Sequence, residues 1–370
     1  MNKRIWIEVD LKNLEYNFKV IRNRLKAGCR LLAVVKQNAY GHGLRVIAKY
    51  LEKKGVDFLG VNSQEEAFQL LQAKVRTPIL VLSNTIFFKN LEYFLKKRVR
   101  FTLTEAGLLK SLDKLAKKNN LKALAHIKVD TGMGRLGLRQ DQALSFIKKV
   151  FSYKNVEVEG LYSHFSSAEE DISYTNYQIR NFLTLKEELK KKGISFKINH
   201  LCNSSGFLNF KKAHLDMVRI GLLLYGIKPH PCLRINLKPL LSFKARLIYI
   251  KELGKNSFIS YANTFQTKRK TLIGIVSCGY AYGYPLSLSN RGEVLIRGKR
   301  CKILGRICMD HMIVDLTPVK NLVSLGEEVI LIGKEKAQEV TVEELSQKAE
   351  TIPYQIITNL SSSLQRVYKK

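Results

Sequence analysis

The feature that most constrains this chain is a regular alternation of short apolar segments and amphipathic helices over its first 225 or so residues. Apolar runs of strand length, each followed by helical periodicity, predict a parallel sheet whose strands are connected by helices. One helix start is marked by the capping box SQEE at 63–66, which precedes an apolar run from Ala67. Eight such units predict a closed barrel. The predicted strands are 30–36, 57–61, 78–82, 99–103, 124–129, 156–163, 196–201 and 217–220.

The two ends of the chain do not fit this eight-unit pattern. A strand over 5–9 precedes a helix that Asp10 begins, and it is surplus unless residues 1–10 pair with a second domain. After residue 235, short strands with turn signals such as RGK at 297–299 replace the long helices. We therefore expect an α/β protein: a (β/α)8 TIM-type barrel over 1–235, then a mostly antiparallel β domain over 236–370. The strands predicted there are 240–250, 258–261, 272–277, 294–296, 301–305, 312–316 and 329–332.

Length and composition agree with two domains and exclude several classes of protein. A chain of 370 residues with 45% hydrophobic content can bury more than one core. It contains no run of about 18 apolar residues, and its first ten residues turn acidic before a signal core could form, so we expect no membrane association. The cysteines form no CxxC pair, which predicts neither disulfides nor a metal site and suits the cytoplasm. They are Cys29, Cys202, Cys232, Cys278, Cys301 and Cys308.

The charge is the one feature that favours a different class. Lysine and arginine number 63 against 31 acidic residues, a formal net charge of +32, which is a balance common in nucleic-acid binders. The basic runs 96–98 and 190–192 lie at predicted helix ends, however, and no basic tail or aromatic-interleaved patch occurs. We interpret the charge as a solvated surface and expect no nucleic-acid partner.

Chemistry in a barrel gathers at the carboxyl ends of its strands. The first strand ends in Leu-Ala-Val-Val followed by Lys36, whose amine is thereby delivered from an apolar stem to the barrel mouth. Such a position lowers an amine's pKa and favours a carbonyl-reactive lysine, although a lysine that merely extends to water fits the same pattern.

The ends of the last two strands offer a phosphate site. They read NSSG at 203–206 and RIGL at 219–222, with backbone N–H groups beside glycine and serine hydroxyls in the first. Each motif alone occurs in ordinary loops. Arg219 stands where it can face a cofactor ring, and a lysine, a phosphate cradle and this arginine together predict pyridoxal 5'-phosphate.

Nine segments then show that the chain resembles the alanine racemase family along nearly its whole length. The resemblance implies a barrel followed by a β domain, pyridoxal phosphate as cofactor, and racemisation of alanine that supplies peptidoglycan synthesis. The segments are AVVKQNAYGHG at 33–43, HIKVDTGMGRLG at 126–137, YSHFSS at 162–167, HLCNSSG at 200–206, VRIGLLLYG at 218–226, SYANTF at 260–265, CGYAYGYP at 278–285, GRICMDHM at 305–312 and TIPY at 351–354.

The resemblance implies two catalytic bases, because a proton must leave one face of a planar carbon and return to the other. Lys36 would bind the cofactor covalently and act as one base, and Tyr261 of SYANTF would be the second. A phenol needs neighbouring charge or hydrogen bonds to act at neutral pH, and His164 and Arg219 resemble that network. Without the resemblance, Tyr261 would be read as a half-buried strand residue and His164 as a satisfied core histidine.

The family's tyrosine comes from the partner subunit, which implies a head-to-tail homodimer with shared active sites. Arg219 would contact the pyridine nitrogen, Arg135 the cofactor and the substrate carboxylate, and Met309 the same carboxylate through its N–H. Tyr280 would narrow the entry, and Lys128, carried by some members as a carbamate, would hold Arg135. Cys308 and Asp310, on either side of Met309, would support that segment. The remaining cofactor contacts implied are Tyr40, Asn203, Ser204, Gly221, Leu222 and Tyr354.

The chain departs from the family pattern at Gln37 and Tyr282, neither of which is a proposed base. A broad-specificity or serine racemase is the strongest rival within the same chemistry. A barrel-type decarboxylase would need a cysteine-containing acidic motif that we do not find, and a non-enzymatic pyridoxal-phosphate-binding protein would leave the β domain unexplained.

Overall fold

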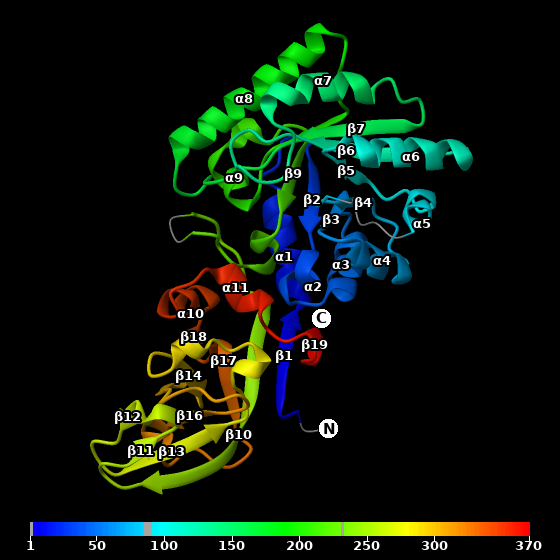
Figure 1. Ribbon diagram of the computed structural model, residues 1–370. Coiled ribbons are helices and arrows are strands. Elements are labelled where there is room, and N and C mark those ends of the chain that lie inside the picture. Colours follow the sequence, from blue (N-terminus) through cyan, green and yellow to red (C-terminus); the bar gives the residue numbers. More distant parts are fainter. Residues whose placement is uncertain (1–2, 85–89, 231–232) are drawn as a thin grey trace.

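The computed structural model describes residues 3–84, 90–230 and 233–370. Eight parallel strands form two four-stranded sheets, in the orders β4-β3-β2-β9 and β5-β6-β7-β8. A bridge between Leu80 and Arg100 joins β4 to β5, and the Arg219 N–H donates to the Cys202 carbonyl between β8 and β9. The sheets therefore close into the predicted (β/α)8 barrel (Figure 1). The strands are β2 Arg30–Val34, β3 Phe58–Val61, β4 Ile79–Val81, β5 Phe101–Leu103, β6 Ala123–Lys128, β7 Val156–Tyr162, β8 Ile198–His200 and β9 Met217–Ile220.

The helices begin where the sequence offers side-chain caps. Asp10 accepts a hydrogen bond from the Asn13 N–H at the start of α1, and Ser63 accepts one from the Glu66 N–H at the start of α4. The apolar residues that follow face the barrel, as the periodicity predicts. The helices of the barrel part are α1 Leu11–Arg22, α2 Lys36–Tyr40, α3 Leu44–Lys53, α4 Gln64–Gln72, α5 Leu91–Lys96, α6 Ala106–Lys118, α7 Gln140–Val150, α8 Ile172–Lys191 and α9 Ser204–Asn209.

The rest of the chain is a β structure in which every strand pair but one is antiparallel. β1 pairs antiparallel with β10 and parallel with β19, so the first strand belongs to this sheet and not to the barrel. The boundary at residue 235 stays a prediction. The elements are β1 Ile5–Asp10, β10 Leu241–Leu253, β11 Phe258–Ile259, β12 Phe265–Gln266, β13 Thr271–Val276, β14 Glu293–Ile296, β15 Lys299–Lys302, β16 Met312–Asp315, β17 Glu328–Glu335, β18 Gln338–Val340, α10 Val342–Lys348, α11 Pro353–Thr358 and β19 Arg366–Lys369.

Several predicted strands end one to three residues earlier than expected, and two of these differences fall at predicted site residues. The first barrel strand stops at Val34, so Lys36 begins the short turn α2 instead of ending a strand. The strand predicted over 258–261 stops at Ile259, because Ser260 has a φ of 66° and turns the backbone into the 3-10 turn Tyr261–Asn263. The periodicity also failed to predict β12, β18, β19, α10 and α11, which are too short for a clear pattern.

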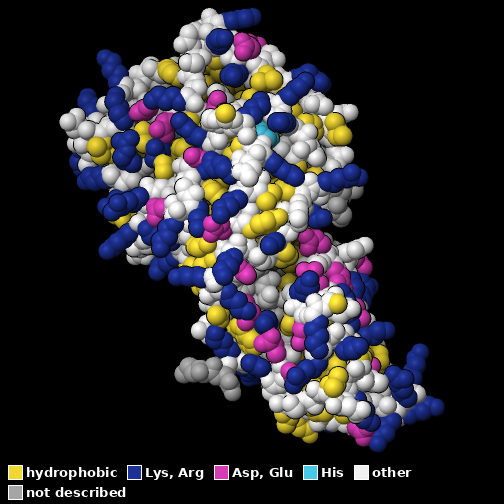
Figure 2. All heavy atoms as spheres, turned by 180° about the vertical axis from the view of Figure 1, so that it is seen from behind, with side chains coloured by type: hydrophobic (Ala, Val, Ile, Leu, Met, Phe, Trp, Pro, Cys, Tyr) yellow, Lys and Arg dark blue, Asp and Glu magenta, His cyan; other side chains and the backbone are white. Residues whose placement is uncertain are grey.

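The surface and the remaining composition features can be stated briefly. Lysine and arginine side chains are dispersed over the face shown in Figure 2, with acidic and apolar groups among them. Across the described ranges, no helix combines the length and apolar character needed to span a membrane. Among those same residues no three His, Cys, Asp or Glu side chains gather as a metal site, and five cysteines are free thiols. Cys232 lies outside the described residues.

Candidate active site

Lys36 stands at the barrel mouth, two residues beyond the end of β2. Burial, and then the nearby Arg135 charge, lower the pKa of its amine. Its Nζ has no hydrogen-bond or ion-pair partner within the described part of the chain. The four residues after it, 37–40, all have φ near +52°, a left-handed run that costs about 1 kcal/mol or more per residue. The Glu66 carboxylate offsets part of this cost by accepting the N–H groups of Gln37 and Asn62.

Arg219 lies on β9 with only 3% of its surface exposed, held by an array of acceptors. Its Nη1 donates to His200 Nδ1 at 2.8 Å, and its Nη2 to the Ser163 and Leu201 carbonyls at 2.7 and 2.9 Å. Burial lowers the pKa of Arg219 to about 10, so it stays a cation at neutral pH. The Nε–H finds no acceptor among the described residues, which leaves this N–H for a ligand.

His164 is the neighbour of Arg219 at the mouth. Arg219 Nη2 lies 3.2 Å from His164 Nδ1, and because a guanidinium only donates, Nδ1 is the acceptor. Burial and the adjacent Arg219 hold the pKa of His164 well below its ordinary value, so the ring is neutral. Its single proton is therefore on Nε2.

A cradle of small and hydroxyl-bearing residues lies at the ends of β8 and β9. The Gly221 N–H donates to Ser204 Oγ at 3.2 Å, and Asn203 Oδ1 accepts from the Gly206 N–H at the start of α9. Tyr40 closes the cradle so tightly that a Cβ on Gly221 would come 2.7 Å from its hydroxyl. The Tyr354 ring of α11 lies 6.1 Å from that of Tyr40.

The cradle and the mouth suit a phosphorylated ligand. Burial raises the pKa of both Tyr40 and Tyr354, so their hydroxyls stay protonated and can donate to an anion. Leu222 follows Gly221 and is buried beneath the cradle. A close glycine backbone with hydroxyl donors is what a phosphate dianion requires.

Lys128 and Arg135 add two more cations to the site. Lys128, at the end of β6, is 6% exposed, and burial followed by the Arg219 and Arg135 charges lowers its pKa to about 7. Asp130 shapes the intervening loop, since its carboxylate accepts the N–H of Arg135 and of the three residues before it. Together with Lys36 and Arg219, the Lys128 and Arg135 side chains create a positive electrostatic potential at the barrel mouth. This potential favours a ligand with two anionic groups.

Apart from Tyr354, the predicted residues of the β domain form a second group. Tyr261, Tyr280 and Met309 are 68%, 44% and 55% exposed. The Tyr280 N–H donates to the Cys308 carbonyl at 3.1 Å, and Cys308 Sγ lies 3.4 Å from the hydroxyl of the residue before Tyr261. Asp310 is half-buried in the same turn.

Tyr280 lines a hollow with Thr351 and Gln355, on either side of Tyr354, whereas Tyr261 lies apart from the barrel mouth of its own chain. Tyr261 follows β11, which lies with β12 at the end of the β domain remote from the barrel strands (Figure 1). The segment that carries Tyr261 therefore lies away from α2, which begins at Lys36 (Figure 1).

Three further residues shape the site, and motif reasoning did not assign them a role. His200 accepts from Arg219, and the Tyr162 ring stacks on His200 with centroids 4.6 Å apart and lies 5.2 Å from the guanidinium carbon of Arg219. Both residues occur inside quoted motifs, at inward positions near strand ends. Glu66 was read only as a helix cap, and its contact with the turn after Lys36 has no local signal.

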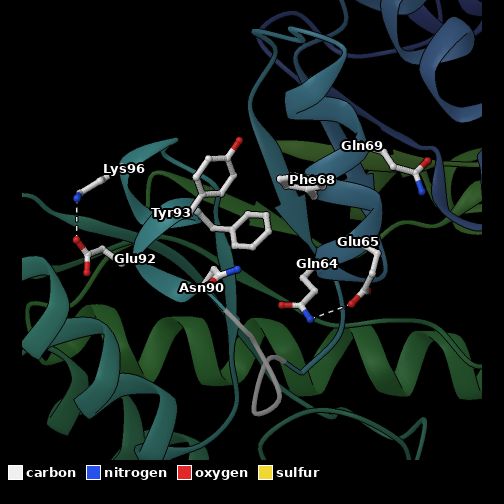
Figure 3. Close-up of a pocket in the computed structure, with 9 residues that line it drawn as sticks. Gln64, Glu65, Phe68, Gln69, Asn90, Glu92, Tyr93 and Lys96 are labelled. Atoms are coloured by element: carbon white, nitrogen blue, oxygen red, sulfur yellow. Dashed lines mark hydrogen bonds and ion pairs between the residues drawn. The ribbon is translucent and has the colours of Figure 1, made fainter.

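A separate hollow on the outside of the barrel contains none of these residues. It measures about 660 Å³, lies between α4 and α5, and is lined by Phe68, Tyr93, Phe94 and polar neighbours (Figure 3). Its walls carry no cationic cluster comparable with the barrel mouth.

The closed barrel, the unpartnered lysine at its first strand end, the phosphate-sized cradle and the buried arginine define a class: β/α-barrel proteins built to hold pyridoxal phosphate. Two family models extend this result over both parts of the chain. Residues 9–229 match the alanine racemase N-terminal domain, and residues 240–368 match the alanine racemase C-terminal domain. The chain belongs to the alanine racemase family.

Individual relatives agree with this assignment. The chain is 42% identical to the alanine racemase of Halothermothrix orenii over 376 residues, which cover all of this chain and 99% of the relative. It superposes on an alanine racemase of Clostridium difficile 630 with a TM-score of 0.93 at 32% identity, covering all of this chain and 96% of that one. An alanine racemase of Bartonella henselae with covalently bound pyridoxal phosphate gives a TM-score of 0.88 at 28% identity, covering 99% of this chain and all of that one.

Proposed function

We propose that this protein interconverts L-alanine and D-alanine with pyridoxal 5'-phosphate as cofactor, and that the D-alanine serves peptidoglycan synthesis. The observation that carries the proposal is the amine of Lys36, which is half-buried, has no partner among the described residues, and has a lowered pKa at the same barrel mouth as the phosphate cradle. Full-length relatives named alanine racemase support the substrate.

The residues present fit the cofactor. The cradle of Tyr40, Ser204, Asn203, Gly221, Leu222 and Tyr354 would hold its phosphate, and the free Nε–H of Arg219 would face its ring nitrogen. When bound, pyridoxal phosphate supplies an electron-accepting ring that makes the α-proton of an amino acid acidic. A permanently charged guanidinium at the ring nitrogen disfavours protonation there and so suppresses side reactions.

Lys36 supplies one of the two proton-transfer groups. Its lowered pKa keeps a larger fraction of the amine neutral at physiological pH, and only the neutral amine can accept a proton. Arg135 would hold the substrate carboxylate, together with the backbone N–H of Met309. Lys128, near half-neutral at pH 7, is competent to form the carbamate that would hold Arg135 in place.

Tyr261 would supply the second base from the partner subunit of a head-to-tail homodimer. Its 68% exposure, remote from its own barrel, supports this assignment, because a chain acting alone would leave it in solvent. The Nε2–H of neutral His164, which Arg219 leaves unused, would be available to donate to the phenolic oxygen. Tyr280, with Cys308 and Asp310 behind Met309, would narrow the entry and favour a small side chain.

One assay separates this proposal from its rivals. Purified protein is incubated separately with L-alanine, L-serine and L-lysine, and D-enantiomer and carbon dioxide are measured. We expect D-alanine with little D-serine and no carbon dioxide. A comparable yield of D-serine would indicate a broad-specificity racemase. Carbon dioxide released from lysine would indicate a decarboxylase, and cofactor binding without turnover would indicate a non-enzymatic binding protein.

A further inference from the structure

Beneath Arg219, a line of polar side chains continues down the barrel interior. His200 Nδ1 accepts a hydrogen bond from Arg219 Nη1 at 2.8 Å, and His200 Nε2 lies 2.9 Å from Nδ1 of His126. His126 Nε2 in turn lies 4.0 Å from the carboxylate of Glu159, which is paired with Arg100 at 2.9 Å. Both imidazoles are completely buried. The line thus connects Arg219 to the ion pair between Glu159 and Arg100.

The position of every proton in this line follows from its first member. A guanidinium has only donors, so His200 Nδ1 must accept. A neutral His200 then carries its proton on Nε2 and donates it to His126 Nδ1. His126 must consequently carry its own proton on Nε2, which makes no hydrogen bond among the described residues and lies 4.0 Å from the negative carboxylate of Glu159. Burial lowers the pKa of His126 to about 3 and that of His200 well below its ordinary value, so both rings remain neutral.

The barrel makes room for His126 at one specific position. Gly160 of β7 pairs with His126 of β6, where the register of the two strands shifts. A Cβ on Gly160 would lie 2.4 Å from His126 Nδ1, the very atom that accepts from His200. Gly160 has no positive φ, so backbone conformation does not explain the glycine, whereas the imidazole does.

We propose that His126 is a positioning residue for Arg219: by accepting the His200 proton, it locks His200 as the acceptor that orients the guanidinium. Without that acceptor, His200 can present a proton toward Arg219, and two donors then face each other in a buried site. Only the last link, from Arg219 to the cofactor ring, rests on the proposed function.

The first test reads the protons directly. Protein carrying 15N-labelled histidine is studied without cofactor at neutral pH by long-range proton–nitrogen NMR, with resonances assigned from His126→Gln and His200→Gln variants. We expect pyridine-type Nδ1 and pyrrole-type Nε2 signals for both His126 and His200. A proton on His200 Nδ1, or two protons on either ring, overturns the proposal whether or not the protein racemises alanine.

The second test asks whether the line matters to the cofactor site. His126→Leu removes the acceptor, Gly160→Ala displaces the ring, and His126→Gln restores an acceptor oxygen. We expect the first two to weaken pyridoxal phosphate binding to the apoprotein about tenfold, the loss of roughly one charge-coupled hydrogen bond, and His126→Gln to recover most of it. The control is Gly254→Ala, whose Cβ meets nothing closer than 4.0 Å.

A structural role alone gives a different pattern. If His126 only fills space, His126→Leu retains cofactor affinity and leaves the His200 nitrogen signals in place, while His126→Gln offers no advantage over it. That result refutes the proposal. If the NMR result holds and alanine is not racemised, the proposed function fails and the proton arrangement stands.

Discussion

Mixing two inactive variants tests whether active sites are shared between subunits. Under the proposed mechanism, the Lys36→Ala chain lacks the first base and the Tyr261→Phe chain lacks the second. Within one chain Lys36 begins α2 at the barrel mouth, whereas Tyr261 follows β11 at the remote end of the β structure (Figure 1) and is 68% exposed. Each active site of the proposed dimer therefore takes Lys36 from one subunit and Tyr261 from the other.

The expected activity follows from this arrangement. In a heterodimer of the two variants, one site receives both substitutions and the other receives neither, so about half of the wild-type activity per dimer returns. A random mixture of subunits contains the heterodimer as about half of all dimers, which lowers the expected value to about one quarter. Each variant alone retains only the residual activity of a site with one base.

The assay uses co-expression with two different affinity tags, sequential purification of the heterodimer, and measurement of D-alanine. The matched control is a heterodimer of the wild-type chain and a chain that carries both substitutions. If each site is contained within one chain, this control keeps one intact site. Shared sites predict instead that this control has two singly damaged sites and almost no activity. An inactive Lys36→Ala and Tyr261→Phe heterodimer beside a half-active control would refute the reasoning.

Three further predictions use other parts of the structure. Lys36→Ala is expected to abolish both turnover and the visible absorbance of the bound cofactor, because no covalent link can form; an unchanged spectrum would exclude Lys36. The pKa of Lys128 is lowered from 10.5 to about 7, so between these pH values the unfolded apoprotein binds one more proton than the folded one. The free energy of unfolding of the wild-type apoprotein, measured by urea titration, should therefore rise with pH relative to that of Lys128→Met. A pH-independent difference between the two proteins would contradict the burial of that amine. Asp10→Ala removes the cap that accepts from Asn13 at 2.9 Å and should lower the free energy of unfolding by about 1 kcal/mol, measured by thermal or urea denaturation; no change would mean that water replaces the cap.

Much of the barrel was predictable because its signals are local. Each strand is a short apolar run, each helix has one apolar face, and Asp10 and Ser63 mark starts that the structure retains. The order of the elements along the chain then leaves few ways to arrange a parallel sheet. The family motifs also lie at strand ends, where a barrel places its chemistry.

Backbone turns at the site were less predictable. The positive φ values after Lys36 and at Ser260 contradict the extended conformation that the neighbouring residues favour. Such strain persists only where contacts from elsewhere in the chain sustain it, as Glu66 does for the turn after Lys36.

The amino-acid sequence by itself determined the barrel, the β domain, and the positions of the candidate lysine and of the candidate phosphate loops, because periodicity and motif spacing are properties of neighbouring residues. Only the tertiary structure decided that His126 meets His200 across the barrel, that Gly160 makes space for it, and that Tyr261 lies far from its own Lys36. Contacts between strands distant in sequence depend on how the barrel closes. A pattern of neighbouring residues cannot predict which side chains that closure brings together.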